Sequence, residues 1–125
     1  MKSKSNESVE MYLESILTLG EKLPVVRSVD VANDLGFKKS SVSVAMKNLE
    51  EKNYIIRSEQ GYINLTTDGK AYADKIYDRH KTLTAVLEKL GVDPETAEAD
   101  ACKMEHIISE ETFQAIKRQS ESSDS

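Results

Sequence analysis

The 125-residue sequence has little of several residue types: one cysteine, no tryptophan, two prolines and five glycines. A single cysteine cannot close an internal disulfide, which favours a reducing compartment. The scarcity of glycine and proline favours helices over a loop-rich or all-β domain. No apolar run is long enough to span a bilayer, and the basic N-terminus lacks the apolar stretch of a secretory signal. We therefore expect a cytoplasmic protein that does not enter a membrane.

Basic residues are outnumbered by acidic ones, which argues against nucleic-acid binding. The formal net charge is -5, with 17 basic and 22 acidic residues, whereas nucleic-acid-binding domains are usually basic. The deficit lies in the second half, because residues 1–66 carry nine basic and nine acidic side chains and residues 67–125 carry eight and thirteen. Residues 38–57 are locally positive. The first half of the chain therefore remains compatible with DNA binding.

The first half has the spacing of a helix-turn-helix. Apolar residues recur at helical intervals over 7–20, and we expect Gly20 to end this first helix. Ser28 is the expected N-cap of a short helix that stops at Gly36, and Ser40 or Ser41 is the expected N-cap of the next. A helix, a tight turn with glycine and a second helix form this motif.

Residues 54–66 change to the alternating period of strands on either side of a SEQG turn. A two-stranded hairpin directly after a helix-turn-helix is a wing, so residues 1–70 are predicted to form a winged helix-turn-helix DNA-binding domain. A long helix then runs from residue 67 to about 90, and a helix that begins at Asp93-Pro94 runs to about 108. A last short helix starts at Ser109, so a second, helical domain covers 71–118 and the polar residues 119–125 form a disordered tail.

The predicted DNA contacts follow from how this motif docks. The second helix enters the major groove with its N-terminal residues at base edges, where serine hydroxyls can approach closely and lysines can contact phosphates. An alternative is a solvated helical hairpin with capping serines and solubilising lysines, but the adjoining wing favours DNA binding. Glu59 and Gln60 at the wing tip should add little affinity. The predicted contacts are Arg27, Ser28, Lys38, Lys39, Ser40, Ser41, Ser43, Lys47 and Arg57.

The segment DACKMEH carries metal-ligand chemistry. On a helix, Cys102, Glu105 and His106 are spaced i, i+3 and i+4, which places them on one face. Thiolate, carboxylate and imidazole together favour a transition metal over magnesium or calcium. Taken alone, a cysteine is more often a small buried apolar residue than a ligand. Further donors are Glu98 on the same stripe, His80 on the long helix, and Met11 and Glu14 on the first helix, so three helices could converge on one centre.

These segments resemble the iron- and manganese-dependent repressors typified by the diphtheria toxin repressor and the manganese transport regulator. The resemblance covers nearly all of residues 7–118 and is carried by EMYLESI, SVSVAMKNLEEKNYI, LTTDGK, DRHKTL and, most specifically, EADACKMEHIISEE. It implies a mainly α fold, in which a winged helix-turn-helix domain precedes a helical dimerisation and metal-binding domain. It also implies that the protein binds operator DNA as a homodimer and controls metal uptake genes.

The resemblance also implies ligands. The primary site of the iron branch corresponds to Met11, Cys102, Glu105 and His106, whereas the manganese branch has aspartate and glutamate at the first two positions. Sulfur donors favour Fe(II), with Mn(II) as the alternative and Co(II), Ni(II) or Zn(II) as surrogates. A second metal site is predicted from Glu14, His80 and Glu98. Thr84 and Glu98 depart from the ancillary site of the iron branch, and Glu14 matches a manganese-branch ligand.

Three other hypotheses about the function are compatible with the sequence. One is a Mn(II)-responsive repressor, another is a winged-helix regulator that uses Cys102 as a redox sensor, and the third is a protein-interaction module. An enzyme is not expected, because the sequence has no glycine-rich phosphate loop, no HExxH motif and no Ser/His/Asp set. We expect neither catalytic residues nor a small-molecule substrate. The sequence ends before the SH3-like domain of the iron branch could begin, so we expect the shorter architecture.

Overall fold

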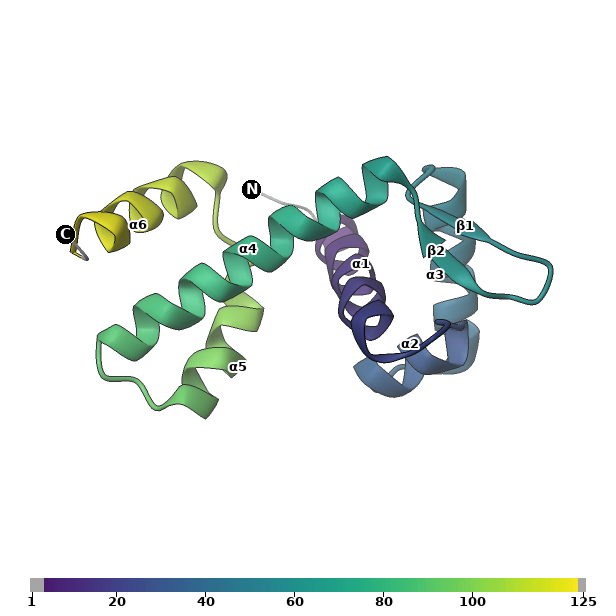
Figure 1. Ribbon diagram of the computed structural model, residues 1–125, viewed down its shortest axis with the longest axis horizontal. Coiled ribbons are helices and arrows are strands. Elements are labelled where there is room, and N and C mark those ends of the chain that lie inside the picture. Colours follow the sequence, from purple (N-terminus) through teal and green to yellow (C-terminus); the bar gives the residue numbers. More distant parts are fainter. Residues whose placement is uncertain (1–3, 124–125) are drawn as a thin grey trace. The chain divides into compact units, whose positions relative to one another are not determined.

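The computed structural model describes residues 4–123, in which six helices and one hairpin follow one another along the chain (Figure 1). The order is the predicted one: helix-turn-helix, wing and three further helices. Contacts divide the chain into a unit of residues 8–74 and a unit that runs on from Lys75 and includes the residues before Ser8. The elements are α1 (Lys4–Lys22), α2 (Ser28–Leu35), α3 (Lys39–Glu51), β1 (Ile55–Arg57), β2 (Ile63–Leu65), α4 (Thr67–Lys89), α5 (Pro94–Met104) and α6 (Glu110–Ser123).

The helix-turn-helix forms as predicted around a small apolar core. Gly36 ends α2 with φ of +71°, and its N–H donates to the carbonyl of Ala32 at 2.9 Å. This left-handed backbone conformation suits glycine because it has no Cβ. Helices α1, α2 and α3 and both strands contribute core side chains, among them Leu13, Val31, Val42, Met46, Leu49, Ile55 and Ile63.

The predicted helix ends were wrong at three places in this unit. α2 is capped by Arg27, not Ser28, because the Asp30 carboxylate accepts the Arg27 N–H at 2.9 Å. Lys38, not Ser40 or Ser41, precedes α3, so both serines lie in its first turn. Gly20 does not end α1, which continues to Lys22. Pro24 supplies the stop, since the residue before a proline is disfavoured in helical conformation.

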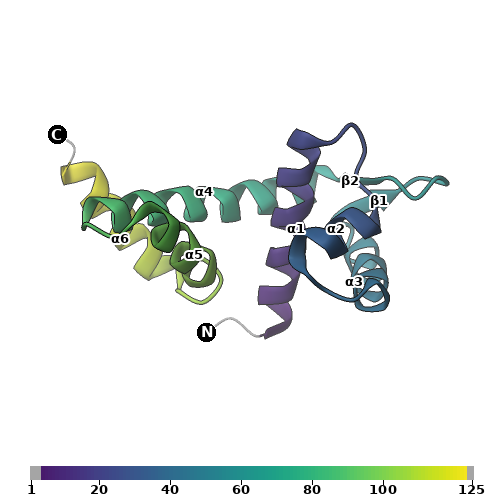
Figure 2. The same cartoon turned by 90° about the horizontal axis from the view of Figure 1, so that it is seen from below.

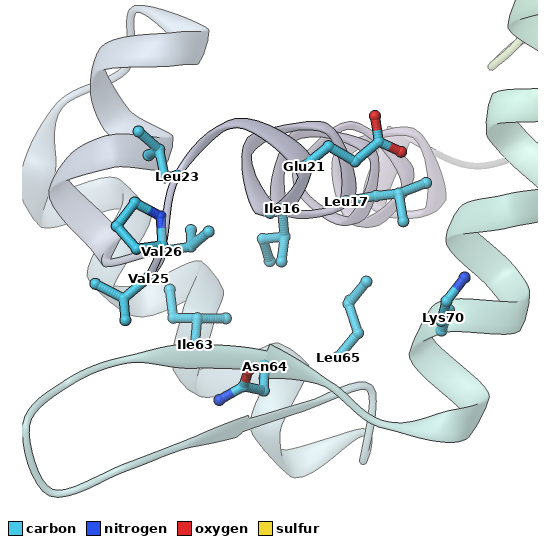
Figure 3. Close-up of a pocket in the computed structure, with 12 residues that line it drawn as sticks. Ile16, Leu17, Glu21, Leu23, Val25, Val26, Ile63, Asn64, Leu65 and Lys70 are labelled. Carbon is cyan, nitrogen blue, oxygen red and sulfur yellow. The ribbon is translucent and has the colours of Figure 1, made fainter.

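The hairpin confirms the predicted wing. β1 and β2 are antiparallel, with Ile55 opposite Leu65 and Arg57 opposite Ile63. The N–H of Ile63 also donates to the carbonyl of Val26 at 2.7 Å, which ties β2 to the segment after α1. Beside this bond, apolar side chains from α1, the following loop and β2 line a pocket of about 320 Å³ (Figure 3). The wing is therefore supported by α1.

Gly69 is required where α4 leaves the wing. A Cβ at this position would overlap the carbonyl oxygen of Tyr54, so only glycine allows the backbone to approach this closely. Its N–H donates to the hydroxyl of Thr66 at 3.0 Å, which satisfies one donor of the first helical turn. The start of α4 is thereby fixed against the hairpin.

In the second unit, α5 and α6 lie alongside α4 (Figure 2). Asp93 caps α5 by accepting the Glu95 N–H at 3.2 Å, and Pro94 occupies the first turn, as expected. α5 ends at Met104, four residues before the predicted end at 108. The Ser109 hydroxyl accepts the Thr112 N–H at 3.1 Å, which confirms the predicted start of the last helix.

The C-terminal helix is longer than expected. α6 continues to Ser123, so residues 119–123 are helical and not part of a disordered tail, while 124–125 lie outside the described residues. Each residue added to an existing helix gains one backbone bond, which lets a polar segment prolong it. Among the described residues, no helix is long and apolar enough to cross a membrane.

Candidate metal centre and nucleic-acid interface

A buried carboxylate between two imidazoles forms the centre of the second unit. Glu105 has no exposed surface, and its Oε2 lies 3.0 Å from Nδ1 of His80 on α4. Its Oε1 lies 3.1 Å from Nε2 of His106, which is also buried. An anionic oxygen donor and two nitrogen donors at this spacing form a donor set suited to divalent transition metals. The residues present therefore fit a metal ion.

Arg79, which is absent from the residues predicted from the sequence, holds the turn that carries Glu105 and His106. Its side chain is 3% exposed, and Nη1 donates to the backbone carbonyls of Glu105 at 3.0 Å and Ile108 at 3.1 Å. Nη2 donates to the Glu110 carboxylate at 2.7 Å. One planar guanidinium therefore closes the end of α5 and joins it to α4 and α6.

The same guanidinium acts on the charge of Glu110. The hydrogen bond from Arg79 lowers the pKa of the Glu110 carboxyl, with a second contribution from the hydrogen bond of Gln114. Arg79 also lies over the ring of Phe113, 5.2 Å from its centroid. Glu110 therefore stays ionised at neutral pH and compensates the buried positive charge.

The three predicted ligands of the DACKMEH segment differ in burial. Because the helix ends at Met104, Glu105 and His106 lie in the turn that follows it and point into the unit. Cys102 is still helical and its side chain is exposed. Glu98, one turn earlier, is exposed as well. The interior of this unit thus brings His80, Glu105 and His106 together, and leaves the side chains of Cys102 and Glu98 at its surface.

Met11 and Glu14 belong to α1 in the unit of residues 8–74, and both are half-buried. The next residue, Ser15, is buried and donates to Asp34 of α2 at 2.7 Å. On the same helix, the ring of Tyr12 meets that of Phe37 edge-on, 5.9 Å between centroids. The helix that carries Met11 and Glu14 is therefore joined directly to the helix-turn-helix.

Most of the predicted DNA contacts lie on the outer surface of α3 and just before it. Lys38, which precedes the helix, is exposed, and so are the five predicted residues within it: Lys39, Ser40, Ser41, Ser43 and Lys47. The buried face of the same helix packs Val42, Met46 and Leu49. The helix thus presents a polar, locally basic face to solvent, as a recognition helix does.

Three predicted contacts lie beside the wing or on it. Arg27 donates to the Tyr62 hydroxyl at 3.3 Å and lies over that ring at 5.0 Å, while Ser28 is half-buried. The guanidinium of Arg57 is held by Glu50 of α3 at 2.7 and 3.0 Å. Because this ion pair offsets the charge of Arg57, we expect that residue to contribute less than Lys39 to phosphate binding.

A winged helix-turn-helix followed by a helical unit with buried imidazole and carboxylate donors defines the class: a metal-responsive DNA-binding regulator. Two family models match the chain. The iron dependent repressor N-terminal DNA binding domain matches residues 4–63, and the iron dependent repressor metal binding and dimerisation domain matches residues 66–123. The chain belongs to the iron-dependent repressor family, a family of metal-dependent transcriptional repressors, and the expected fold class is confirmed.

Two curated relatives agree with this assignment. An HTH-type transcriptional regulator of Methanocaldococcus jannaschii is 37% identical over 114 residues, 90% of this chain and 91% of that one. The transcriptional regulator MntR of Escherichia coli O6:H1 is 34% identical over 111 residues, 89% of this chain and 72% of that one. Both are transcriptional regulators, which confirms the expectation that the chain is not an enzyme.

Solved structures share the fold. A manganese-dependent transcriptional repressor in complex with manganese aligns with a TM-score of 0.82 and 25% identity over 89% of this chain. The match spans 51% of that protein, about half of its length. A hypothetical protein from Sulfolobus solfataricus aligns with a TM-score of 0.69 and 23% identity, over 91% of this chain and 88% of that one. This second likeness concerns the fold alone.

Proposed function

We propose that this protein is a repressor that binds operator DNA as a homodimer when a divalent transition metal occupies a centre built on Glu105. One observation carries the proposal: a carboxylate with no exposed surface lies 3.0 and 3.1 Å from two imidazole nitrogens. Burying a carboxylate together with two imidazoles costs free energy unless their charges are compensated. A bound divalent cation would supply that compensation.

The proposed primary ligands are Met11, Cys102, Glu105 and His106. A second metal would take Glu14 and His80, with Glu98 as a further donor. The trio of His80, Glu105 and His106 supports the inner donors. The thiol of Cys102 is exposed, and the side chains of Met11 and Glu14 are half-buried. Ligands from α1 and α5 would make the bound ion a crosslink between these helices.

Such a crosslink would reach the DNA-binding surface through α1. Ser15 of this helix donates to Asp34 of α2, and Ile16 and Leu17 line the pocket whose other wall includes Ile63 and Leu65 of the wing (Figure 3). A constraint on α1 is therefore transmitted to both DNA-binding elements. The metal favours DNA binding to the extent that it binds the DNA-competent arrangement more tightly than others.

A homodimer is supported by exposed apolar residues of the second unit. Leu90, directly after α4, is 76% exposed, and Ile107, after α5, is 59% exposed. A chain of 125 residues buries a limited share of its surface alone, so apolar contacts with a second copy would add to its core. Two recognition helices would then read half-sites about one DNA turn apart.

Fe(II) is the proposed metal, with control of metal uptake genes as its physiological setting. The donors that support it are the thioether of Met11 and the thiol of Cys102, since sulfur ligands favour iron over manganese. Mn(II) is the second candidate. It is favoured by the carboxylate and imidazole set around Glu105 and by the solved relative that is a manganese-dependent repressor in complex with manganese.

The experiment that tests this function begins with a duplex selected from a random pool by the protein and either Mn(II) or anaerobic Fe(II). The affinity for that duplex is then measured with metal and with chelator. Typical allosteric coupling predicts binding about 5- to 150-fold tighter with metal, and sedimentation should give two chains per duplex. Equal affinity in both conditions would contradict metal control.

Replacing Lys39 tests the placement of α3 on DNA. Lys39→Ala should weaken binding to all duplexes by a similar factor, because a phosphate contact carries no sequence information. The slope of log affinity against log salt should fall by roughly one. Lys52→Ala, an exposed lysine at the other end of α3, is the matched control and should keep the slope. Selective loss at one base position would show that Lys39 reads a base instead.

Replacing Met11 tests the choice of metal. Met11→Asp exchanges a soft thioether for a charged oxygen donor, so the response should move from Fe(II) toward Mn(II). Because Cys102 remains, we expect a partial shift, on the order of tenfold in the ratio of half-saturating metal concentrations. The ratio is measured from DNA binding under anaerobic reducing conditions. If the ratio of half-saturating Fe(II) to Mn(II) concentrations is unchanged, Met11 is a packing residue of α1 and not a metal ligand.

A further inference from the structure

An apolar side chain lies in the middle of the outward face of α3, among polar ones. Val44 is 62% exposed, although the helix buries Val42, Met46 and Leu49 on its opposite face. Helical spacing places Val44 next to Ser40 one turn before it and Asn48 one turn after it, and both of these residues are exposed. Valine is therefore the large apolar group on the surface that the recognition helix offers to DNA.

Folding of the helix does not account for a valine at this position. A β-branched residue is a poorer helix former than alanine or lysine, and an exposed one recovers little by burial. Single apolar residues do occur on protein surfaces without a role. Val44, however, is the sixth residue of α3, in the half of a recognition helix that faces base edges.

We propose that Val44 reads the 5-methyl group of a thymine in each operator half-site. In the major groove, thymine is the base that presents a methyl group, and apolar side chains recognise it by contact. The neighbouring side chains of Ser40 and Lys47 offer a hydroxyl and a positive charge, which add affinity for DNA. Val44 adds discrimination between thymine and the other bases. This inference rests on the proposed function and specifies the base that its recognition helix selects.

Uracil tests this contact, because it differs from thymine by that methyl group alone. Each thymine of a duplex selected with Mn(II) is replaced in turn by uracil, and affinity is measured for the full-length protein. Burial of one methyl-sized group corresponds to about 0.8 kcal/mol. Replacing the contacted thymine of a half-site by uracil should therefore lower the affinity for the duplex about fourfold. Val44→Ala should bind the thymine and uracil duplexes equally at that position.

Ile56→Ala is the matched control, since Ile56 is 60% exposed but lies on β1 of the wing. This variant should keep the fourfold preference for thymine. The proposal is overturned if Val44→Ala keeps the preference, or if no thymine of the selected duplex is sensitive to replacement in the wild type. A wild type that binds no duplex in a metal-dependent way would contradict the proposed function as well, which separates the two failures.

Discussion

Glu105→Gln is expected to abolish metal-dependent DNA binding while the chain still folds. The carboxylate has no exposed surface and lies between His80 and His106. Glutamine has nearly the same shape but no charge, so it cannot offset a divalent cation. Loss of even an outer-shell partner costs 10- to 100-fold in metal affinity, and loss of this proposed ligand should cost about 100-fold or more.

The measurement is a Co(II) titration of the folded variant followed by DNA binding in excess metal. Circular dichroism of both metal-free proteins first establishes that the helices are intact. Glu88→Gln removes an exposed carboxylate from α4 and should leave metal affinity unchanged. If Glu105→Gln binds Co(II) as tightly as the wild type does, the metal centre lies elsewhere.

Arg79→Met should have the second-largest effect, on both stability and metal affinity. The substitution removes donors to the carbonyls of Glu105 and Ile108 and leaves Glu110 without its positive partner. Because the Glu110 carboxylate is 47% exposed, the main loss comes from the backbone carbonyls left without a donor, about 1–3 kcal/mol for each one that is buried. Because the turn that carries Glu105 and His106 loses its anchor, metal affinity should also fall, by about 10- to 100-fold.

Lys117→Met is the matched control for Arg79. Lys117 pairs with Asp78 at 3.0 Å and lies over Phe113 at 5.9 Å, so it also joins α6 to α4. Its described hydrogen bond goes to Asp78 and not to the carbonyls of Glu105 or Ile108. Partly exposed ion pairs contribute little to stability. Urea unfolding of the metal-free proteins and metal titration of the folded ones separate the two effects. Reduced stability with unchanged metal affinity would limit Arg79 to holding the fold.

Local chemistry accounts for the parts of the fold that the sequence predicted well. Gly36 marks the turn of the helix-turn-helix because its left-handed backbone suits glycine, and Asp93-Pro94 marks the start of α5 because both residues favour a first turn. The change of period at Ile55 marks the wing. Each of these signals depends on neighbours close in sequence, so it is visible without the tertiary structure.

Helix ends that depend on competing local bonds were harder to predict. Ser28 and Ser40 are good capping residues, but the Asp30 carboxylate accepts the Arg27 N–H and makes Arg27 the N-cap of α2, and α3 begins one residue before Ser40. At the end of α5, the carbonyls of Glu105 and Ile108 turn toward Arg79. These two hydrogen bonds join Arg79 to residues that lie 26 and 29 positions later in the sequence, so helical periodicity could not reveal them.

The candidate site was predicted by residue type better than by geometry. The segment that contains Glu105 and His106 was identified from its donors, but helical periodicity did not predict that α5 ends at Met104 or that Cys102 is exposed while Glu105 and His106 are buried. Arg79 was missed, although a signal existed. It follows Ile76 by three residues and precedes Leu83 by four, which places a charged residue on the buried stripe of α4.

The central claim is that Glu105 and its neighbouring imidazoles hold the metal that controls DNA binding. Its most direct test is a crystal of the full chain grown with Mn(II), or anaerobically with Fe(II), and measured at the absorption edge of that metal. We expect an anomalous peak within ligand distance of the Glu105 carboxylate and at least one of the His80 and His106 rings. A peak elsewhere, with Glu105 bound only to protein groups, would contradict it.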